Sequence, residues 1–229
     1  MTVAEQGADA VLELRDIPER HEVRSEELVH RGWVWNLKSE TAAYGDGEIT
    51  REFIDHTGAV SVVALDEQDR VLLIRQYRHP VGFRQWELPA GLLDDPHESP
   101  LVAAQRELAE EADYAAEEWS LLLDFWTTPG GCNESIRIFL ARGLTPTGRI
   151  FERVHEEADI ETAWVPLDEA VTAILRGDLH NPAMLQGVFA ANEARRRGWE
   201  TLRPADAPWP TKSAGPSVLP RALADGNRA

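Results

Sequence analysis

Residues 91–114 read GLLDDPHESPLVAAQRELAEEADY, and this stretch decides how the rest of the chain is interpreted. Ser99 followed by Pro100 is typical of a helix start, because a serine side chain caps free N–H groups and proline fits the first helical turn. Apolar residues then recur at helical spacing, at Leu101, Ala104, Leu108 and Ala112. The pattern predicts a helix that buries this stripe, which fixes its rotation about its own axis.

Three glutamates, Glu107, Glu110 and Glu111, lie on one flank of the stripe. Side chains three and four residues apart meet on a helix surface, so these carboxylates are expected to share a patch about one turn long. Like charges at this spacing repel each other unless a cation lies among them. Oxygen ligands with no Cys or His nearby favour Mg2+ or Mn2+ over zinc. The alternative interpretation is an acidic helix face that is simply solvated.

The spacing of this stretch resembles the Nudix box, the signature of hydrolases that cleave nucleoside diphosphates linked to another group. The match runs from Gly91 through Glu98 to residues 106–111, Arg-Glu-Leu-Ala-Glu-Glu. There are two departures from the family pattern. Six residues instead of five separate Gly91 from Glu98, and Asp113 replaces the glycine that ends the helix in the family. An extra loop residue costs little, and Asp tolerates a left-handed conformation better than most residues.

The resemblance implies a role for each matched position. The residues implied to bind Mg2+ (or Mn2+) are Glu107, Glu111, the Ala90 carbonyl and, in support, Glu110. Catalysis is implied to involve Glu110 and Arg106 as well, with Arg106 orienting the glutamates through charged hydrogen bonds and Glu98 in the same network.

Composition limits the classes of function that are open to the chain. At 229 residues and 43% hydrophobic content we expect a globular domain with extensions. A formal net charge of -17 argues against affinity for nucleic acid or an anionic membrane, and it makes local cations necessary wherever phosphates bind. Residues 1–20 contain no apolar run of signal-peptide length, so a cytoplasmic protein is expected. Cys132 is the single cysteine, which excludes an internal disulfide.

Local patterns divide the chain into four parts: a flexible N-terminus (1–22), a β-sheet domain (23–57), the main domain (58–202) and a Pro/Ala-rich tail (203–229). Strands are expected at 26–37, 48–56, 59–65, 71–77, 119–125, 136–141 and 162–165, with a turn at 44–47 and a hairpin formed by 59–65 and 71–77. Later helices are expected at 167–176 and 181–197. The fold class expected is α+β, a Nudix-type α/β/α sandwich with a mixed sheet, plus a small N-terminal β-sheet domain.

Three further features resemble ADP-ribose pyrophosphatases within that family. Pro129, in TPGGCNES, resembles their marker downstream of the box, and Arg75 and Arg78 resemble an arginine-bearing strand that contacts the substrate diphosphate. Glu157 matches a catalytic glutamate carried by a loop. The alternative interpretations are solvated strand arginines and a solvated acidic turn.

The N-terminal region contributes the remaining candidates for substrate binding. Trp33 and Trp35 alternate with Val34, so both are expected on one side of a strand, either stacked on adenine or in the core. The resemblance implies that Arg51 and Glu52 lie near the adenine and that the N-terminal sheet exchanges between the subunits of a homodimer.

The function predicted is Mg2+-dependent hydrolysis of ADP-ribose to AMP and ribose 5-phosphate, with Glu157 taking the proton of the attacking water. One alternative is a Nudix pyrophosphatase for another nucleoside diphosphate sugar or an oxidised nucleotide. The other is a Nudix-fold ligand sensor without catalysis, which would need a DNA-binding extension that the acidic termini do not offer.

Overall fold

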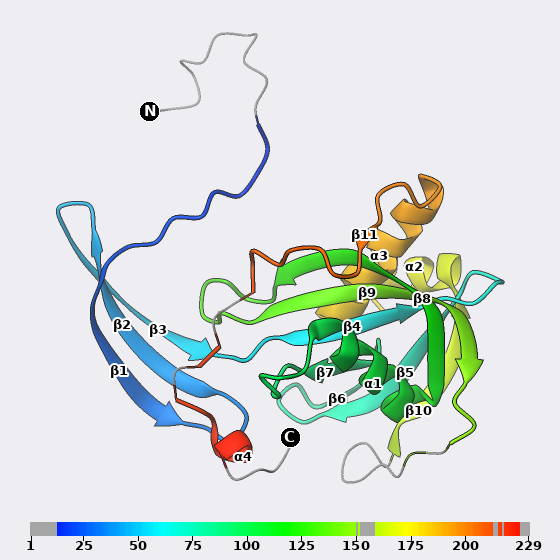
Figure 1. The fold of residues 1–229 in the computed structure, drawn as a ribbon, viewed down its shortest axis with the longest axis horizontal. Helices are drawn as coiled ribbons and strands as arrows, with labels where there is room; N and C mark the ends of the chain where they lie inside the picture. The colour runs from blue at the N-terminus through cyan, green and yellow to red at the C-terminus, as the bar shows by residue number, and fades with distance from the viewer. Residues whose placement is uncertain (1–12, 150, 152–158, 213–214, 217, 225–229) are drawn as a thin grey trace.

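The computed structural model describes residues 13–149, 151, 159–212, 215–216 and 218–224 of the chain (Figure 1). The strands of the first half are β1 (Val23–Arg31), β2 (Asn36–Tyr44), β3 (Gly47–Asp55), β4 (Ala59–Ala64), β5 (Arg70–Arg78), β6 (Phe83–Glu87) and β7 (Ala90–Leu92). The later strands are β8 (Tyr114–Trp126), β9 (Ser135–Pro146), β10 (Glu161–Pro166) and β11 (Arg203–Pro204). The helices are α1 (Pro100–Ala112), α2 (Leu167–Leu175), α3 (Pro182–Arg196) and α4 (Arg221–Ala224).

The first three strands form an antiparallel meander, here called the N-terminal sheet, which lies to one side of the molecule (Figure 1). The turn expected at 44–47 joins β2 to β3. The single strand expected over 26–37 is wrong, because the chain bends at 32–35 and divides it into the end of β1 and the start of β2. A Cβ at Gly32 would lie 1.9 Å from the Trp35 carbonyl oxygen, so the bend needs glycine there.

The elements from β4 to α3, here called the body, contain two sheets. One is a mixed sheet in which β4 and β9 run parallel; its order is β11-β8-β9-β4-β7, where the edge strand β11 comes from the chain beyond α3, and the other sheet has the order β10-β5-β6. The hairpin expected from 59–65 and 71–77 is therefore wrong. Only a single bridge, between Leu65 and Val71, joins the two segments within the described residues. Strand β4 pairs with β9 and β7 in one sheet, and β5 pairs with β10 and β6 in the other.

Helices cover both faces of the mixed sheet, because successive side chains of β4 point to opposite faces and all of them are buried. Val60, Val62 and Ala64 point to one face and pack with buried residues of α1. Ala59, Val63 and Leu65 point to the other face, where buried residues of α2 and α3 pack. The α/β/α arrangement predicted from the sequence is confirmed.

The described residues beyond Leu202 lie along the molecule, and apart from β11 and α4 they are outside helices and strands. We call described residues 203–212, 215–216 and 218–224 the C-terminal strap. Its strand β11 pairs with β8 in the body, and the backbone N–H groups of Arg221 and Ala222 donate to the carbonyls of Gly32 and Trp33. The strap therefore runs from the body to the N-terminal sheet (Figure 1).

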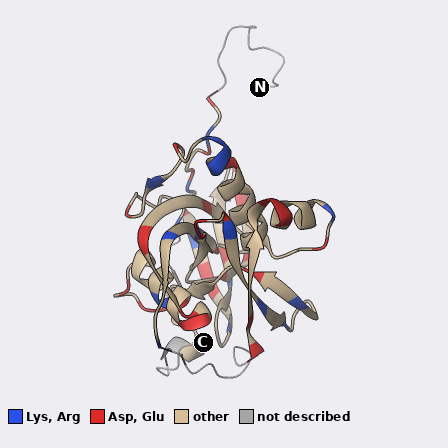
Figure 2. Cartoon of the chain, turned by 90° about the vertical axis from the view of Figure 1, so that its right-hand side faces the viewer, with Lys and Arg blue, Asp and Glu red and all other residues tan. Residues whose placement is uncertain are grey.

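The described surface carries charges of both signs. In the view of Figure 2, Lys and Arg segments of the ribbon are scattered among Asp and Glu segments. Within the described residues, no helix is both long enough and apolar enough to cross a membrane.

Candidate active site

Helix α1 begins and ends as its sequence predicts. The Ser99 side chain accepts a hydrogen bond from the Val102 N–H at 3.3 Å and caps the helix start. At the other end Asp113 adopts a left-handed conformation, with φ 60° and ψ 29°, and its N–H donates to the Ala109 carbonyl. Asp113 thus fills the conformational role that glycine has in the box, and its Oδ1 accepts a hydrogen bond from the Phe151 N–H at 3.3 Å.

Arg106 gathers the carboxylates around α1. Its guanidinium donates twice to Glu98, with both N–O distances at 3.0 Å, and also to Glu107 at 2.6 Å and Glu110 at 3.0 Å. The hydrogen bonds to Glu98 are the largest reason why the pKa of Arg106 lies above its ordinary value, and they outweigh burial, which acts in the opposite direction. The arginine therefore stays charged and holds three carboxylates in place.

Glu107 and Glu111 also contact strand β7, which precedes the helix. Glu107 lies so close to Gly91 that a Cβ there would be 1.8 Å from Glu107 Oε1, and glycine is needed for this approach. Glu111 is buried, and its Oε2 accepts a hydrogen bond from the Ala90 N–H at 2.8 Å. The structure thus brings Glu107 and Glu111 to the strand that carries the Ala90 carbonyl.

The donor set fits a hard divalent cation. It consists of carboxylate oxygens beside a backbone strand, and the cradle at Gly91 is one that any side chain would fill. In the part of the chain that the structure describes, no three Asp, Glu, His or Cys side chains are arranged closely enough to hold a metal ion together. The metal-ligating roles of Ala90, Glu107, Glu110 and Glu111 therefore stay a prediction.

The arginines on β5 have carboxylate partners. Arg78 makes a two-pronged contact with Glu87, at 2.9 and 2.7 Å, and Gln76 donates to the same carboxylate at 3.3 Å. Glu87 is buried, whereas nearly half of the Arg78 side chain is exposed. Arg75 pairs with Glu161 and lies over the Trp86 ring, 4.9 Å from its centroid.

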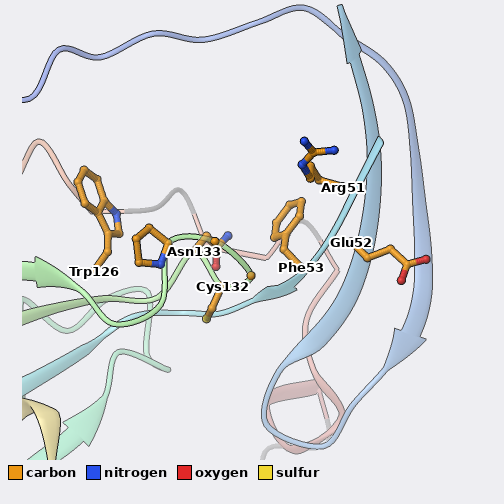
Figure 3. Close-up of a pocket in the computed structure, with 9 residues that line it drawn as sticks. Arg51, Glu52, Phe53, Trp126, Cys132 and Asn133 are labelled. Atoms are coloured by element: carbon orange, nitrogen blue, oxygen red, sulfur yellow. The ribbon is translucent and has the colours of Figure 1, made fainter. Parts of the chain in front are cut away.

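A pocket of about 480 Å³ lies between β3 and the loop of residues 127–134 that joins β8 to β9. It is lined by Arg51, Glu52, Phe53, Trp126, Pro129, Gly130, Gly131, Cys132 and Asn133. Figure 3 shows Arg51 and Phe53 pointing from β3 toward the loop, as alternate residues of a strand do. Glu52 borders the pocket, but its carboxylate points to the other side of the strand (Figure 3).

Some predicted residues lie elsewhere. Trp33 and Trp35 were expected on one strand, but both belong to the bend between β1 and β2, and neither lines the pocket. Trp33 is 54% exposed, so it is not a core residue either. Glu157 lies outside the described residues.

Sequence reasoning missed four residues that complete these sites: Glu87, Phe53, Trp126 and Asn133. Phe53 carried a usable signal, because it is two positions from Arg51 on an expected strand and therefore shares its face. Glu87 stands between the apolar residues Trp86 and Leu88, which marks a carboxylate that needs a partner if the segment is buried. No local pattern indicated Trp126 or Asn133.

Comparisons with known proteins agree with this arrangement. A family model described as NUDIX domain matches residues 55–187. An ADP-ribose pyrophosphatase of Mycobacterium tuberculosis is 42% identical over 189 residues, which cover 82% of this chain and 90% of the relative. A methanol dehydrogenase activator of Bacillus methanolicus is 33% identical over 149 residues, covering 65% of this chain and 80% of the relative.

A solved structure described as an ADP compounds hydrolase superposes with a TM-score of 0.66 over 80% of this chain and 99% of its own chain. At 21% identity this likeness shows the fold alone. The family model spans the box helix, the arginines of β5 and the pocket loop, and it covers more than half of the chain. The chain therefore belongs to the NUDIX family.

Proposed function

We propose that this protein hydrolyses ADP-ribose to AMP and ribose 5-phosphate. One observation carries most of the proposal: Arg51 and Glu52 border the same pocket as Pro129, although the two motifs are far apart in the sequence. Phe53 and Trp126 offer aromatic faces in this pocket, and an adenine ring stacks well on such faces. The relative that is 42% identical is named for hydrolysis of ADP-ribose, which supports the same substrate here.

Glu107, Glu111 and the Ala90 carbonyl would hold Mg2+ (or Mn2+), with Glu110 in support. When bound, such ions neutralise the diphosphate and activate the attacking water. The chain contributes the position of the ligands: Arg106 holds Glu107 and Glu110 from one side, and the Ala90 N–H holds Glu111 from the other. The positive charge of the bound ions would also offset the repulsion between a phosphate-bearing substrate and a chain of net charge -17.

The arginines of β5 would bind the diphosphate. Arg78 is the stronger candidate, because its planar fork is oriented by Glu87 and its side chain is partly exposed. Arg75 is already engaged by Glu161 and Trp86, so it fits a supporting role. Glu157 is proposed as the general base on the strength of the family resemblance.

A second substrate class stays in view, namely other nucleoside diphosphate sugars and oxidised nucleotides, because the box recognises the diphosphate and not the group attached to it. The relative named as a methanol dehydrogenase activator shows that names within the family differ. A ligand sensor without catalysis is less well supported, because the carboxylates of the box are all present, with three held by Arg106 and Glu111 held by the Ala90 N–H.

One experiment separates these candidates: incubation of the protein with a panel of nucleotide sugars and oxidised nucleotides in magnesium, followed by quantification of the products. We expect ADP-ribose to be hydrolysed with the highest kcat/KM and to yield AMP. A higher kcat/KM for another member of the panel would replace the proposed substrate. Binding of ADP-ribose without turnover would favour the sensor.

We also propose that the protein is a homodimer built through the N-terminal sheet. Strand β1 is exposed along nearly its whole length, including Val23, Leu28 and Val29, and a three-stranded sheet of this kind needs a packing partner. Light scattering at micromolar concentration should give twice the mass of the chain, 25.6 kDa. A monomeric mass with full activity would refute the dimer.

A further inference from the structure

The two walls of the pocket are fastened together by a set of hydrogen bonds that neither the box nor the predicted substrate contacts include. Asn133 lies at the centre of the set. Its Nδ2 donates to Asp55 Oδ1 at 2.7 Å, and its Oδ1 accepts from the His56 N–H at 2.8 Å. Both capacities of the amide are thus used to hold the end of β3.

Backbone hydrogen bonds continue the same connection. The Ile54 N–H donates to the Gly131 carbonyl at 2.9 Å, and the Asn133 N–H donates to the Ile54 carbonyl at 3.2 Å. The 127–134 loop therefore runs beside β3 as a short parallel partner, with Ile54 opposite Cys132. We call these contacts between residues 54–56 and 131–133 the joint.

The joint is charged and shielded from water. Asp55 is 5% exposed, so its carboxylate has lost most of its hydration and depends on the donors around it. A hydrogen bond from an amide to a buried carboxylate is stronger than a bond between neutral groups, and its loss leaves an uncompensated charge. The joint consequently fixes the distance between β3 and the loop.

The position of the joint connects it to the pocket. Arg51 and Phe53 precede Asp55 on β3, while Pro129 and Gly130 precede Asn133 on the loop, and all four residues line the pocket. A shift of one wall against the other would change the width of the pocket directly. Geometry of this kind is set by supporting contacts as much as by the groups that touch a ligand.

We propose that Asn133 and Asp55 are positioning residues that set the pocket for the nucleoside half of the substrate. The inference rests on the proposed function only in taking this half to be adenosine 5′-phosphate. The bridge between Asn133 and Asp55 holds the aromatic and arginine side chains of β3 at the separation that an adenine ring requires.

The test exchanges the side chains of Asn133 and Asp55. Asn133→Asp places a carboxylate against the Asp55 carboxylate, removes the donor and keeps an acceptor for the His56 N–H. Asp55→Asn combined with Asn133→Asp restores one donor and one acceptor with the roles reversed. AMP and ribose 5-phosphate, the two products of the proposed reaction, are titrated into each full-length variant by calorimetry in magnesium.

Asn133→Asp should weaken AMP binding by about tenfold, equivalent to about 1.4 kcal/mol, while ribose 5-phosphate binding changes by less than roughly twofold. The double variant should recover AMP affinity to within about threefold of the starting protein. Thr41→Val is the matched control, since it removes a hydrogen bond of 2.8 Å from the same sheet, away from the joint, and should change neither affinity.

Three results would overturn the inference: unchanged AMP affinity in Asn133→Asp, equal weakening of both ligands with a lower melting temperature, or a double variant that binds AMP no better than Asn133→Asp. Failure of the starting protein to bind AMP would overturn it as well. The substrate proposal fails separately, if AMP binds as expected but ADP-ribose is not hydrolysed.

Discussion

Strands β4 and β1 show how differently the two parts of the molecule are stabilised. Every residue of β4 is buried, and its two faces pack against α1 on one side and against α2 and α3 on the other. In β1 every residue but the last is exposed. The body therefore has its own hydrophobic core, whereas the N-terminal sheet depends on contacts with other segments, namely the joint, the C-terminal strap and the proposed second subunit.

This difference corresponds to a division of labour. The box carboxylates and their arginine belong to the body, where a rigid core fixes them. The pocket has one wall on the N-terminal sheet, so its shape depends on polar contacts that are easier to disturb. Changes in the body should therefore affect the rate of the reaction, and changes at the pocket wall of the N-terminal sheet should affect substrate affinity.

The largest effect is expected from the box. Glu107→Gln and Glu111→Gln each remove a charge from the proposed metal site, and each should lower kcat/KM for ADP-ribose by roughly 100-fold or more. Folding should survive, because loss of one carboxylate also relieves repulsion within the cluster. Steady-state rates at limiting magnesium, together with melting temperatures, measure both effects.

Glu193→Gln provides the control for this substitution. Glu193 lies on α3, where it pairs with Arg197 at 2.6 Å, and its replacement changes the same type of side chain away from the box. Its activity should match that of the starting protein. Activity close to normal in both box variants would remove α1 from the mechanism and leave the body as a scaffold only.

The body was also the part that the sequence predicted best. Helix α1 could be predicted from Ser99, Pro100 and an apolar stripe, because all these signals are local and act through backbone geometry. The bend at 32–35 was missed, since the alternation of Trp33 and Trp35 looks like a strand, although Gly32 is the residue that the bend requires. Period-two patterns indicate which face of a strand is buried and do not report where the strand stops.

The joint and the strap could not be predicted, for a different physical reason. Asn133 contacts Asp55 across 78 positions, and Asn36 donates to the Val218 carbonyl across 182 positions. Contacts of this range leave no periodic trace in the sequence, because each needs only one polar side chain. A Pro/Ala-rich tail and a structural strap therefore look the same until the fold is known.

The next largest effect is expected from removing the strap. Truncation after Leu202 deletes the pairing of β11 and exposes Arg137, which donates to the Ala207 and Pro208 carbonyls and lies under the Trp209 ring. It also removes the strap's hydrogen bonds to Gly32, Trp33 and Asn36. At about 1 kcal/mol for each bond, local opening of the N-terminal sheet should become easier by roughly 2–3 kcal/mol.

Hydrogen exchange measures this effect strand by strand. Amides of β1 and β2 should exchange on the order of 30-fold faster or more, while those of β4, in the core of the body, keep their protection. Truncation after Ala224 is the control, because it keeps the described strap and should leave exchange unchanged. Equal acceleration in both parts of the molecule would show that the body also depends on the strap.

The smallest effect is expected from His56 at the joint. Burial lowers the pKa of His56 below its ordinary value of 6.5, and the nearby Glu134 and Asp55 carboxylates only partly oppose this shift. The structure explains why the neutral form is favoured: Nδ1 accepts a hydrogen bond from the Gly58 N–H at 3.1 Å, and a proton on Nδ1 would remove that acceptor. His56 therefore contributes stability above the unfolded pKa, and this contribution is lost as the pH falls from about 6.5 through the folded pKa.

Urea unfolding between about pH 8 and pH 5.5 tests this prediction with His56→Gln as the comparison. The starting protein should lose on the order of 1 kcal/mol more of its free energy of unfolding across that range than the variant does. The loss should be accompanied by faster exchange at the end of β3, because the His56 N–H and the Asn133 side chain share one hydrogen bond. If both proteins lose the same free energy, then His56 is titrating outside the window, and the joint depends on Asn133 and Asp55 without any contribution from the imidazole.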